Sequence, residues 1–148
     1  MTKNVLIKII GTQEINNETE TSEFTTEGRF GHRDGSFYLS YDEGEILGLK
    51  NVKALLYVKE DGTVILQRSG PMTARMVIAA GKRNTCLYNT PFGTITMGIS
   101  AETVKHQFGP EGGSISLSYT IDTDLKLMSR NTLNISFREV NNNVNTCV

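Results

Sequence analysis

The stretch Ser114-Ile115-Ser116-Leu117-Ser118-Tyr119-Thr120-Ile121 alternates small polar residues with large apolar ones. Successive side chains of a β-strand point to opposite faces, so this pattern predicts a strand with one wet face and one dry face. The same two-residue period recurs in Thr94-Ile95-Thr96-Met97-Gly98-Ile99 and in Thr132-Leu133-Asn134-Ile135-Ser136-Phe137. Because the alternation continues from one end of the chain to the other, it leaves no room for a helical layer. The sequence therefore predicts an all-β protein.

Turn signals divide the chain into roughly eight to ten strand segments. Asp34-Gly35 and Asp61-Gly62 each separate two strand-like runs, which is the signature of a tight hairpin. Consecutive hairpins favour neighbouring antiparallel strands, and closing such a meander removes its two exposed edges. We therefore expect a single antiparallel up-and-down β-barrel over residues 1–140, in preference to a sandwich. Residues 141–148 carry too little apolar surface to offset ordering entropy and are expected to form a disordered tail.

Composition excludes several classes of partner. The chain has 148 residues, a size typical of one domain, and a formal net charge of −1 with both signs scattered. This balance predicts neither nucleic-acid binding nor binding to an anionic membrane. The first ten residues are too short and too interrupted by lysine for a signal peptide or a membrane span. With only two cysteines, the chain is expected to be a reduced cytoplasmic protein, either a monomer or a homodimer.

Several motifs together resemble a known family. They are Tyr41-Asp42-Glu43 with Gly48-Leu49, Arg68-Ser69-Gly70 followed by Arg75-Met76, Leu87-Tyr88-Asn89-Thr90-Pro91-Phe92-Gly93, and Gly112-Gly113 before the strand that contains Tyr119. Over nearly its whole length the chain is similar to the YwiB-like family of small bacterial proteins. The resemblance implies a calycin-like β-barrel, akin in shape to the lipocalins, with an interior suited to a small ligand. It supplies no activity and no catalytic residue.

Arg68 is the first candidate for a binding role. It shares its parity with Val64 and Leu66, so it faces the core or the rim of the barrel if they do. A guanidinium cannot lose its charge and must be paired or kept wet. Its partner is either an internal acid, Glu27 or Glu43, or an anionic group on a ligand. Arg75 lies across the next loop and converges on the same anion if the two strands pair, although its own direction stays open.

Tyrosines are the second set of candidates, because a phenol combines an apolar ring with a polar tip and suits the wall of a pocket. Tyr41 and Tyr119 share their parity with apolar neighbours and are expected to point into the barrel. Tyr88 and Tyr57 are further candidates, with core packing as the alternative role for each. Glu43 is expected to hold an arginine in place when no ligand is bound.

No catalytic or metal-binding constellation emerges from the sequence. His32 and His106 lie in polar surroundings without a partner histidine at metal-ligand spacing, so no metal site is expected. Cys86 alternates with strand residues and is interpreted as a small core side chain. No glycine-rich phosphate loop is present, and no cofactor is expected.

Three functions are compatible with these patterns. The leading hypothesis is non-covalent binding of a small amphipathic or anionic ligand in the barrel by Arg68, Arg75, Glu43 and the tyrosines. The alternative is a structural or protein-interaction barrel without a ligand, associating through an edge strand or an apolar patch. A hydrolase-type enzyme that uses pocket carboxylates, Glu43 or Glu27, is the third and least favoured.

Overall fold

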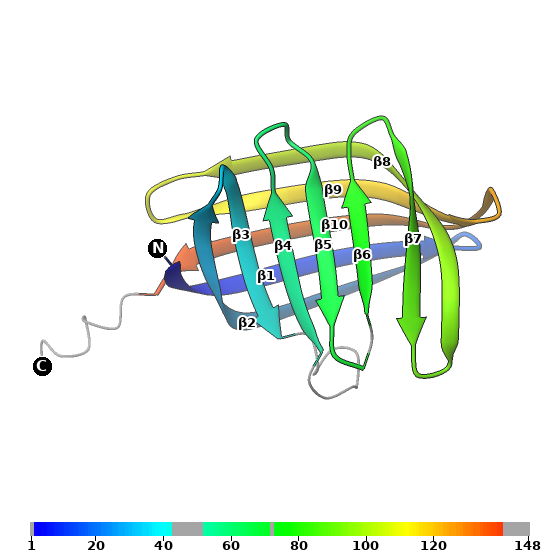
Figure 1. Cartoon of the computed structure of the whole chain (residues 1–148), viewed down its shortest axis with the longest axis horizontal. Coiled ribbons are helices and arrows are strands. Elements are labelled where there is room, and N and C mark those ends of the chain that lie inside the picture. The colour runs from blue at the N-terminus through cyan, green and yellow to red at the C-terminus, as the bar shows by residue number, and fades with distance from the viewer. Residues whose placement is uncertain (1, 43–51, 72, 141–148) are drawn as a thin grey trace, which may run out of the picture.

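The computed structural model of the chain describes residues 2–42, 52–71 and 73–140, and every regular element in these residues is a β-strand, as Figure 1 shows. The strands of the described part are β1 (Thr2–Ile15), β2 (Glu18–Arg33), β3 (Ser36–Asp42), β4 (Lys53–Val58), β5 (Val64–Ser69), β6 (Ala74–Ile78), β7 (Arg83–Thr90), β8 (Gly93–Phe108), β9 (Gly112–Thr123) and β10 (Lys126–Glu139). The predicted all-β class is confirmed.

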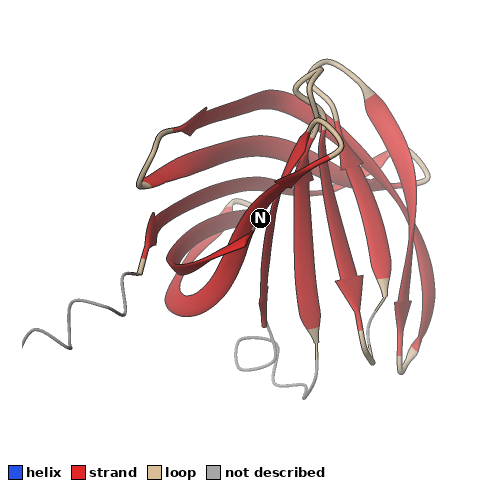
Figure 2. Ribbon diagram, turned by 60° about the vertical axis from the view of Figure 1, so that its left-hand side comes forward, coloured by secondary structure: helices blue, strands red, loops and turns tan. Residues whose placement is uncertain are grey.

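All ten strands belong to one antiparallel sheet in the order β6-β5-β4-β3-β2-β1-β10-β9-β8-β7. Apart from β1 and β10, every pair of neighbours is consecutive in the chain, which is the expected up-and-down meander. In Figure 1 strands β3 to β6 run across β1, β9 and β10, and β2 and β8 curve around the two sides. Figure 2 shows the sheet folded over on itself. The result is a nearly closed barrel.

The dry faces of the strands meet inside this barrel. On β1 the side chains of Val5, Ile7 and Ile9 are buried, and on β9 those of Ile115 and Leu117, while the residues between them are more exposed. The largest fully buried side chains come from all around the sheet and include Ile7, Leu39, Leu56, Leu66, Ile78, Ile99, Ile115, Leu117 and Ile135. Burying each of them stabilises the fold by about 1.5–3 kcal/mol. Side chains therefore fill the centre of the barrel.

Phenylalanines pack together at one end of the barrel. The phenylalanine cluster consists of Phe30, Phe37, Phe108 and Phe137, with ring centroids of contacting pairs 4.6–5.8 Å apart. Tilted and edge-to-face arrangements at these distances are favourable beyond the area that they bury. His32 lies against Phe37 and His106 against Phe108, and both histidines are exposed, as expected. This end is therefore closed by aromatic rings.

The barrel does not close with a continuous ladder. Its edge strands β6 and β7 meet at an isolated bridge, where Thr73 and Asn89 exchange two backbone hydrogen bonds of 2.9 Å. Farther along, the side-chain amide of Asn84 donates to the carbonyl oxygen of Val77 at 3.3 Å in place of a backbone group. The segment that connects β6 to β7 forms backbone hydrogen bonds with Ala101 of β8 instead. Along this part, β6 and β7 do not pair with each other. The sequence predicted a closed barrel without exposed edges, but the edge strands β6 and β7 are only partly joined. We call the line along which they meet the seam.

Three of the described hairpin turns have two consecutive residues in the left-handed region, and the first is Asn16-Asn17 between β1 and β2. At the predicted turn, Asp34 and Gly35 have φ values of 51° and 78°, which suit the type I′ geometry that matches strand twist. In the β9–β10 turn the corresponding residues are Asp124 at 52° and Leu125 at 67°. A leucine rarely adopts this conformation, because its Cβ approaches the following carbonyl oxygen. The backbone of the β9–β10 turn is therefore held by contacts from elsewhere.

Those contacts come from an ion pair on the outer face of β7, β8 and β9. The guanidinium of Arg83 donates two hydrogen bonds to the carboxylate of Asp122, at 2.9 and 2.6 Å. Gly98 lies between them on β8, and a Cβ there would overlap the guanidinium. The carboxylate of Asp122 also accepts the backbone N–H of Leu125 at 3.2 Å. The pair therefore links β7 to β9 and holds the strained turn.

This pair predicts an acid-sensitive contribution to stability. Hydrogen bonds from Arg83 lower the pKa of Asp122 in the folded protein, relative to about 3.9 in the unfolded chain. The stabilisation is therefore fully present above the unfolded pKa and is lost as the pH falls through the folded pKa. We expect Asp122→Asn to lower the urea midpoint at neutral pH and to approach the wild type in acid. Asp124→Asn serves as the control, because asparagine tolerates the left-handed conformation of this turn position. Its urea midpoint should differ little from that of the wild type at either pH. A gap that widens in acid would contradict this assignment.

Candidate functional site

Arg68 lies on the inner face of β5, as its parity predicts. It is half-buried, and its neighbours on the adjacent strands are Ala54 and Ala74, whose small side chains leave room for a long one. Its Nη1 lies 3.8 Å from the Sδ of Met76. The fold therefore places a permanent positive charge at the edge of the apolar core, beside the seam.

Arg75 points to the other side of the sheet. It is exposed on the outer face of β6, between the buried Ala74 and Met76, which settles the direction that the sequence left open. Nevertheless Arg68 and Arg75 line the same hollow, a shallow depression of about 580 Å³ that crosses the seam. Its other lining residues are Gln67, Ser69, Thr73, Ala74, Thr85, Cys86, Leu87 and Asn89. None of these described lining residues is acidic, and two of the residues that line the hollow are arginines.

Cys86 forms part of the wall of this hollow. Its side chain is buried, and its Sγ lies 3.6 Å from the backbone oxygen of Leu87. Burial raises the pKa of the thiol, and a backbone hydrogen bond from Arg75 and the charge of Arg68 oppose the shift only in part. Burial thus favours the protonated thiol over the thiolate, which is the nucleophilic form. The predicted role of Cys86 as a small core side chain is confirmed.

The structure separates the candidate tyrosines. Tyr41 is buried on β3 in the same cross-strand row as Arg68, through Ala54, and its ring lies 6.4 Å from that of Phe24. Tyr88 is half-buried on β7, two residues beyond Cys86 on the same face. Tyr119 is half-buried on β9, opposite Ala101, and packs against the core. Tyr88 thus lies on one of the edge strands, whereas Tyr41 and Tyr119 lie on strands farther into the sheet, and none of the three is among the residues that line the hollow.

Of the two acidic candidates, Glu27 is within the described residues and does not line this hollow. Glu43 lies outside the described residues. Glu27 is exposed on the outer face of β2, since its neighbours Thr26 and Gly28 turn inward. Within the described ranges no group of three or more histidine, cysteine or acidic side chains is arranged to hold a metal ion.

The chain matches one protein family over most of its length. The family model matches residues 7–135 and is described as a domain of unknown function, DUF1934. The chain belongs to the DUF1934 family. Its fold is similar to the crystal structure of YwiB protein from Bacillus subtilis, with a TM-score of 0.82 and 21% identity over 95% of this chain and 94% of that one. The resemblance to the YwiB-like family is confirmed, and no curated protein matches the sequence.

In the residues that the structure describes, no helix is long and apolar enough to cross a bilayer.

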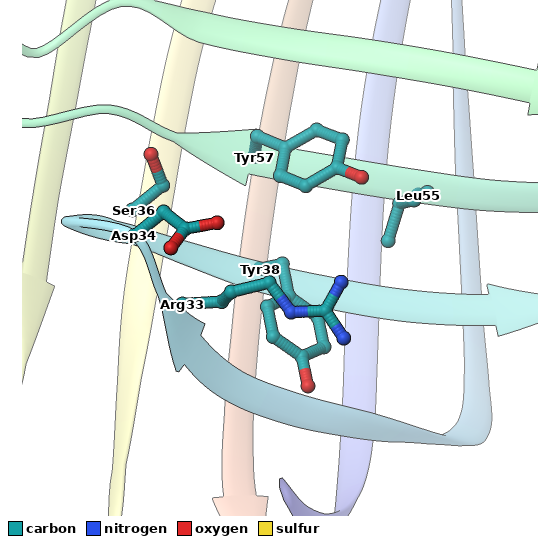
Figure 3. Close-up of a pocket in the computed structure, with 6 residues that line it drawn as sticks. All are labelled: Arg33, Asp34, Ser36, Tyr38, Leu55 and Tyr57. Atoms are coloured by element: carbon teal, nitrogen blue, oxygen red, sulfur yellow. The ribbon is translucent and has the colours of Figure 1, made fainter. Parts of the chain in front are cut away.

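A second hollow of the DUF1934 barrel lies on the outer face, shown in Figure 3. It measures about 400 Å³ and is lined by Arg33, Asp34, Ser36, Tyr38, Leu55 and Tyr57. Tyr57, a candidate for the barrel interior, is therefore outside it, directly opposite Tyr38 on the neighbouring strand. The ring of Tyr38 lies over Gly31, which has no side chain to displace it. Cross-strand aromatic pairs stabilise a sheet, and this role accounts for both tyrosines.

Sequence reasoning missed Thr73, Asn84 and Asn89, which hold the DUF1934 barrel together at the seam. Asn89 also donates from its side-chain nitrogen to the hydroxyl of Thr73 at 3.0 Å. No local signal reveals these residues, because their partners belong to the strand at the other edge of the sheet. By contrast, the outward direction of Tyr38 follows from its alternation with Leu39 and was available from parity alone.

Proposed function

We propose that this protein binds a small ligand with an anionic group at the seam, without covalent attachment. Arg68 and Arg75 would hold the anion from the inner and the outer side of β5 and β6. The observation that carries the proposal is that both arginines line one hollow whose described lining contains no carboxylate. A hollow of this size fits a small molecule.

The chemistry of the arginines indicates the kind of anion. A guanidinium presents a planar fork of N–H donors that matches the oxygens of a carboxylate or a phosphate. Hydroxyl and amide groups of Ser69, Thr73 and Asn89 lie around the same hollow and supply further polar contacts. Ala74 and Leu87 add apolar surface, which favours an amphipathic ligand over a bare inorganic ion.

The packing of the barrel supports a position at the seam rather than along the axis. The central residues, among them Leu56 and Leu66, have 0–1% of their surface exposed and leave no channel there. Tyr88, on the edge strand β7, and Tyr41, in the same cross-strand row as Arg68, are the side chains that we expect to contact the apolar part of the ligand. The expected role of Glu43 as a resting partner of an arginine stays a prediction.

Titration calorimetry with decanoate and decyl phosphate as probes tests this proposal. A hydrogen bond to a charged group contributes about 1.5–3 kcal/mol, so Arg68→Met should weaken binding of the preferred probe by about 10-fold to 150-fold. Methionine keeps the apolar stem beside Met76, so the variant should remain folded. Comparison of the two probes distinguishes a carboxylate ligand from a phosphate ligand.

Arg29→Met provides the matched control. Arg29 is an exposed arginine of β2 that does not line the hollow, and its loss should leave binding unchanged. Equal losses in the Arg29 and Arg68 variants would reveal unspecific attraction by charge. Failure of the wild type to bind either probe, or equal binding of the cationic decyltrimethylammonium, would overturn the proposal.

A further inference from the structure

The hollow drawn in Figure 3 lies on the outer face of the sheet, away from the seam. We call it the outer hollow, and its lining residues are Arg33, Asp34, Ser36, Tyr38, Leu55 and Tyr57. Tyr38 and Tyr57 are directly opposite each other, but in Figure 3 the ring of Tyr38 reaches across β2 and that of Tyr57 lies along β4. Sheet stabilisation accounts for the two tyrosines, but it gives no role to the hollow of about 400 Å³ that their rings border.

The direction of the Tyr38 ring depends on the neighbouring strand. Gly31 of β2 is paired with Tyr38 of β3, and a Cβ on Gly31 would overlap the hydroxyl end of the tyrosine ring. Gly31 is buried although it belongs to the outer face, because this ring covers it. The ring is therefore held against β2, and its half-exposed remainder forms one wall of the outer hollow.

Two opposite charges border the outer hollow without neutralising each other. Arg33 and Asp34 are consecutive and exposed, and their charged groups lie apart in Figure 3. Among the described residues, neither side chain has an ion-pair partner. The carboxylate of Glu60 reaches the same turn, at the place where a Cβ on Gly35 would overlap it. A guanidinium and a carboxylate are thus separately available to a ligand in this hollow.

We infer that the outer hollow binds a free amino acid with an aromatic side chain, in its zwitterionic form. The guanidinium of Arg33 matches the two oxygens of the ligand's carboxylate, and the carboxylate of Asp34 accepts N–H donors of its ammonium group. The aromatic side chain of the ligand packs against the rings of Tyr38 and Tyr57, since aromatic pairs are favourable in offset and edge-to-face arrangements. Leu55 adds apolar surface to the same hollow.

Charge complementarity favours a zwitterion over a ligand with a single charge. An anion without an ammonium group would meet Arg33 but would also be repelled by Asp34 and by Glu60 at the same turn. A cation without a carboxylate would be repelled by Arg33. A zwitterion has no net charge and satisfies both lining groups, which distinguishes this ligand from the anionic ligand proposed for the seam.

An NMR titration of the isotope-labelled full chain with L-phenylalanine tests this inference. Backbone amide shifts should saturate and should be concentrated at residues 31–38 and 55–57. Asp34→Asn and Arg33→Gln should each raise the dissociation constant by about 3-fold to 10-fold. Asparagine tolerates the left-handed conformation of position 34, so this variant should remain folded. Asp124→Asn makes the same change at the corresponding position of the β9–β10 turn and should leave binding unchanged.

Two blocked probes separate the contributions of the two charges. N-acetyl-L-phenylalanine lacks the ammonium group and L-phenylalaninamide lacks the carboxylate, so each should bind the wild type about 3-fold to 10-fold more weakly than L-phenylalanine. Asp34→Asn should cause no further loss with the acetylated probe, because the group that Asp34 contacts is already absent. Arg33→Gln should likewise cause no further loss with the amide.

Three results would overturn the inference. They are the absence of saturable shifts with L-phenylalanine, equal binding of both blocked probes, and an equal loss in the Asp124 and Asp34 variants. Equal binding of the blocked probes would assign the outer hollow to aromatic compounds irrespective of their charge. The inference does not depend on the ligand proposed for the seam, because neither Arg33 nor Asp34 lines that hollow, and both variants should bind decanoate and decyl phosphate as the wild type does.

Discussion

Replacing Leu56 by alanine should lower the free energy of unfolding by about 2–5 kcal/mol. Leu56 lies on β4 between Leu39 of β3 and Leu66 of β5, and none of its surface is exposed. The substitution removes the apolar surface that the leucine side chain buries. It also leaves a cavity, so the surrounding side chains lose their packing contacts with Leu56. Small domains have a total stability of about 5–15 kcal/mol, so this loss is a large fraction of the whole. Urea denaturation followed by circular dichroism measures it.

Leu87→Ala is the matched control for this prediction. It deletes the same atoms from a leucine that is 57% exposed on the edge strand β7, and it should cost no more than about 0.5 kcal/mol. Equal losses in the two variants would mean that the centre of the barrel is not filled around Leu56. The ligand would then have room along the axis of the barrel, and its proposed place at the seam would have to change.

Gly28→Ala should destabilise the protein by about 1–3 kcal/mol or more, through overpacking rather than through a cavity. A Cβ on Gly28 would overlap the backbone oxygen of Ser40 on β3 and the Cδ1 of Ile7 on β1. The backbone cannot give way without separating β2 from β3, in the row that also contains Tyr41. Thermal and urea unfolding of the variant measure the effect.

Gly11→Ala gives the comparison that isolates crowding from glycine flexibility. A Cβ on Gly11 would meet its nearest neighbours, Ser22 and Leu133, at 3.5 and 3.7 Å, which is ordinary contact. Alanine there also restricts the unfolded chain, so the variant should be as stable as the wild type or slightly more stable. If Gly28→Ala matched Gly11→Ala, the close approach of β1, β2 and β3 at Gly28 would be disproved.

The strands were the most predictable part of this protein. Alternation in residues 114–121 identified β9 and its buried face, because the side-chain period of a strand is a local property. Asp34-Gly35 identified a hairpin, because glycine and aspartate tolerate the left-handed angles that its turn requires. The turn at Asp124 and Leu125 carries no such signal in leucine, and the hydrogen bond from Leu125 to Asp122 that supports it became visible only in the fold.

The candidate site was predictable to the extent that it depends on parity. Alternation with Leu66 placed Arg68 on the inner face, and the same rule placed Tyr41 there. Arg75 lies among residues that are apolar on both parities, so its outward direction had to come from the structure. The sequence also did not determine that Arg68 and Arg75 line the same hollow. That arrangement depends on the incomplete pairing between β6 and β7.

By itself, the sequence determined the class of the fold, the order of its hairpins and the face on which most side chains lie. These properties follow from the chemistry of residues within a few positions of one another. Only the tertiary structure decided that β6 and β7 meet as a seam and that Arg83 supports the turn at Leu125. Each of these contacts joins distant segments, and its geometry depends on the register and curvature accumulated over the whole sheet, which no short stretch of residues specifies.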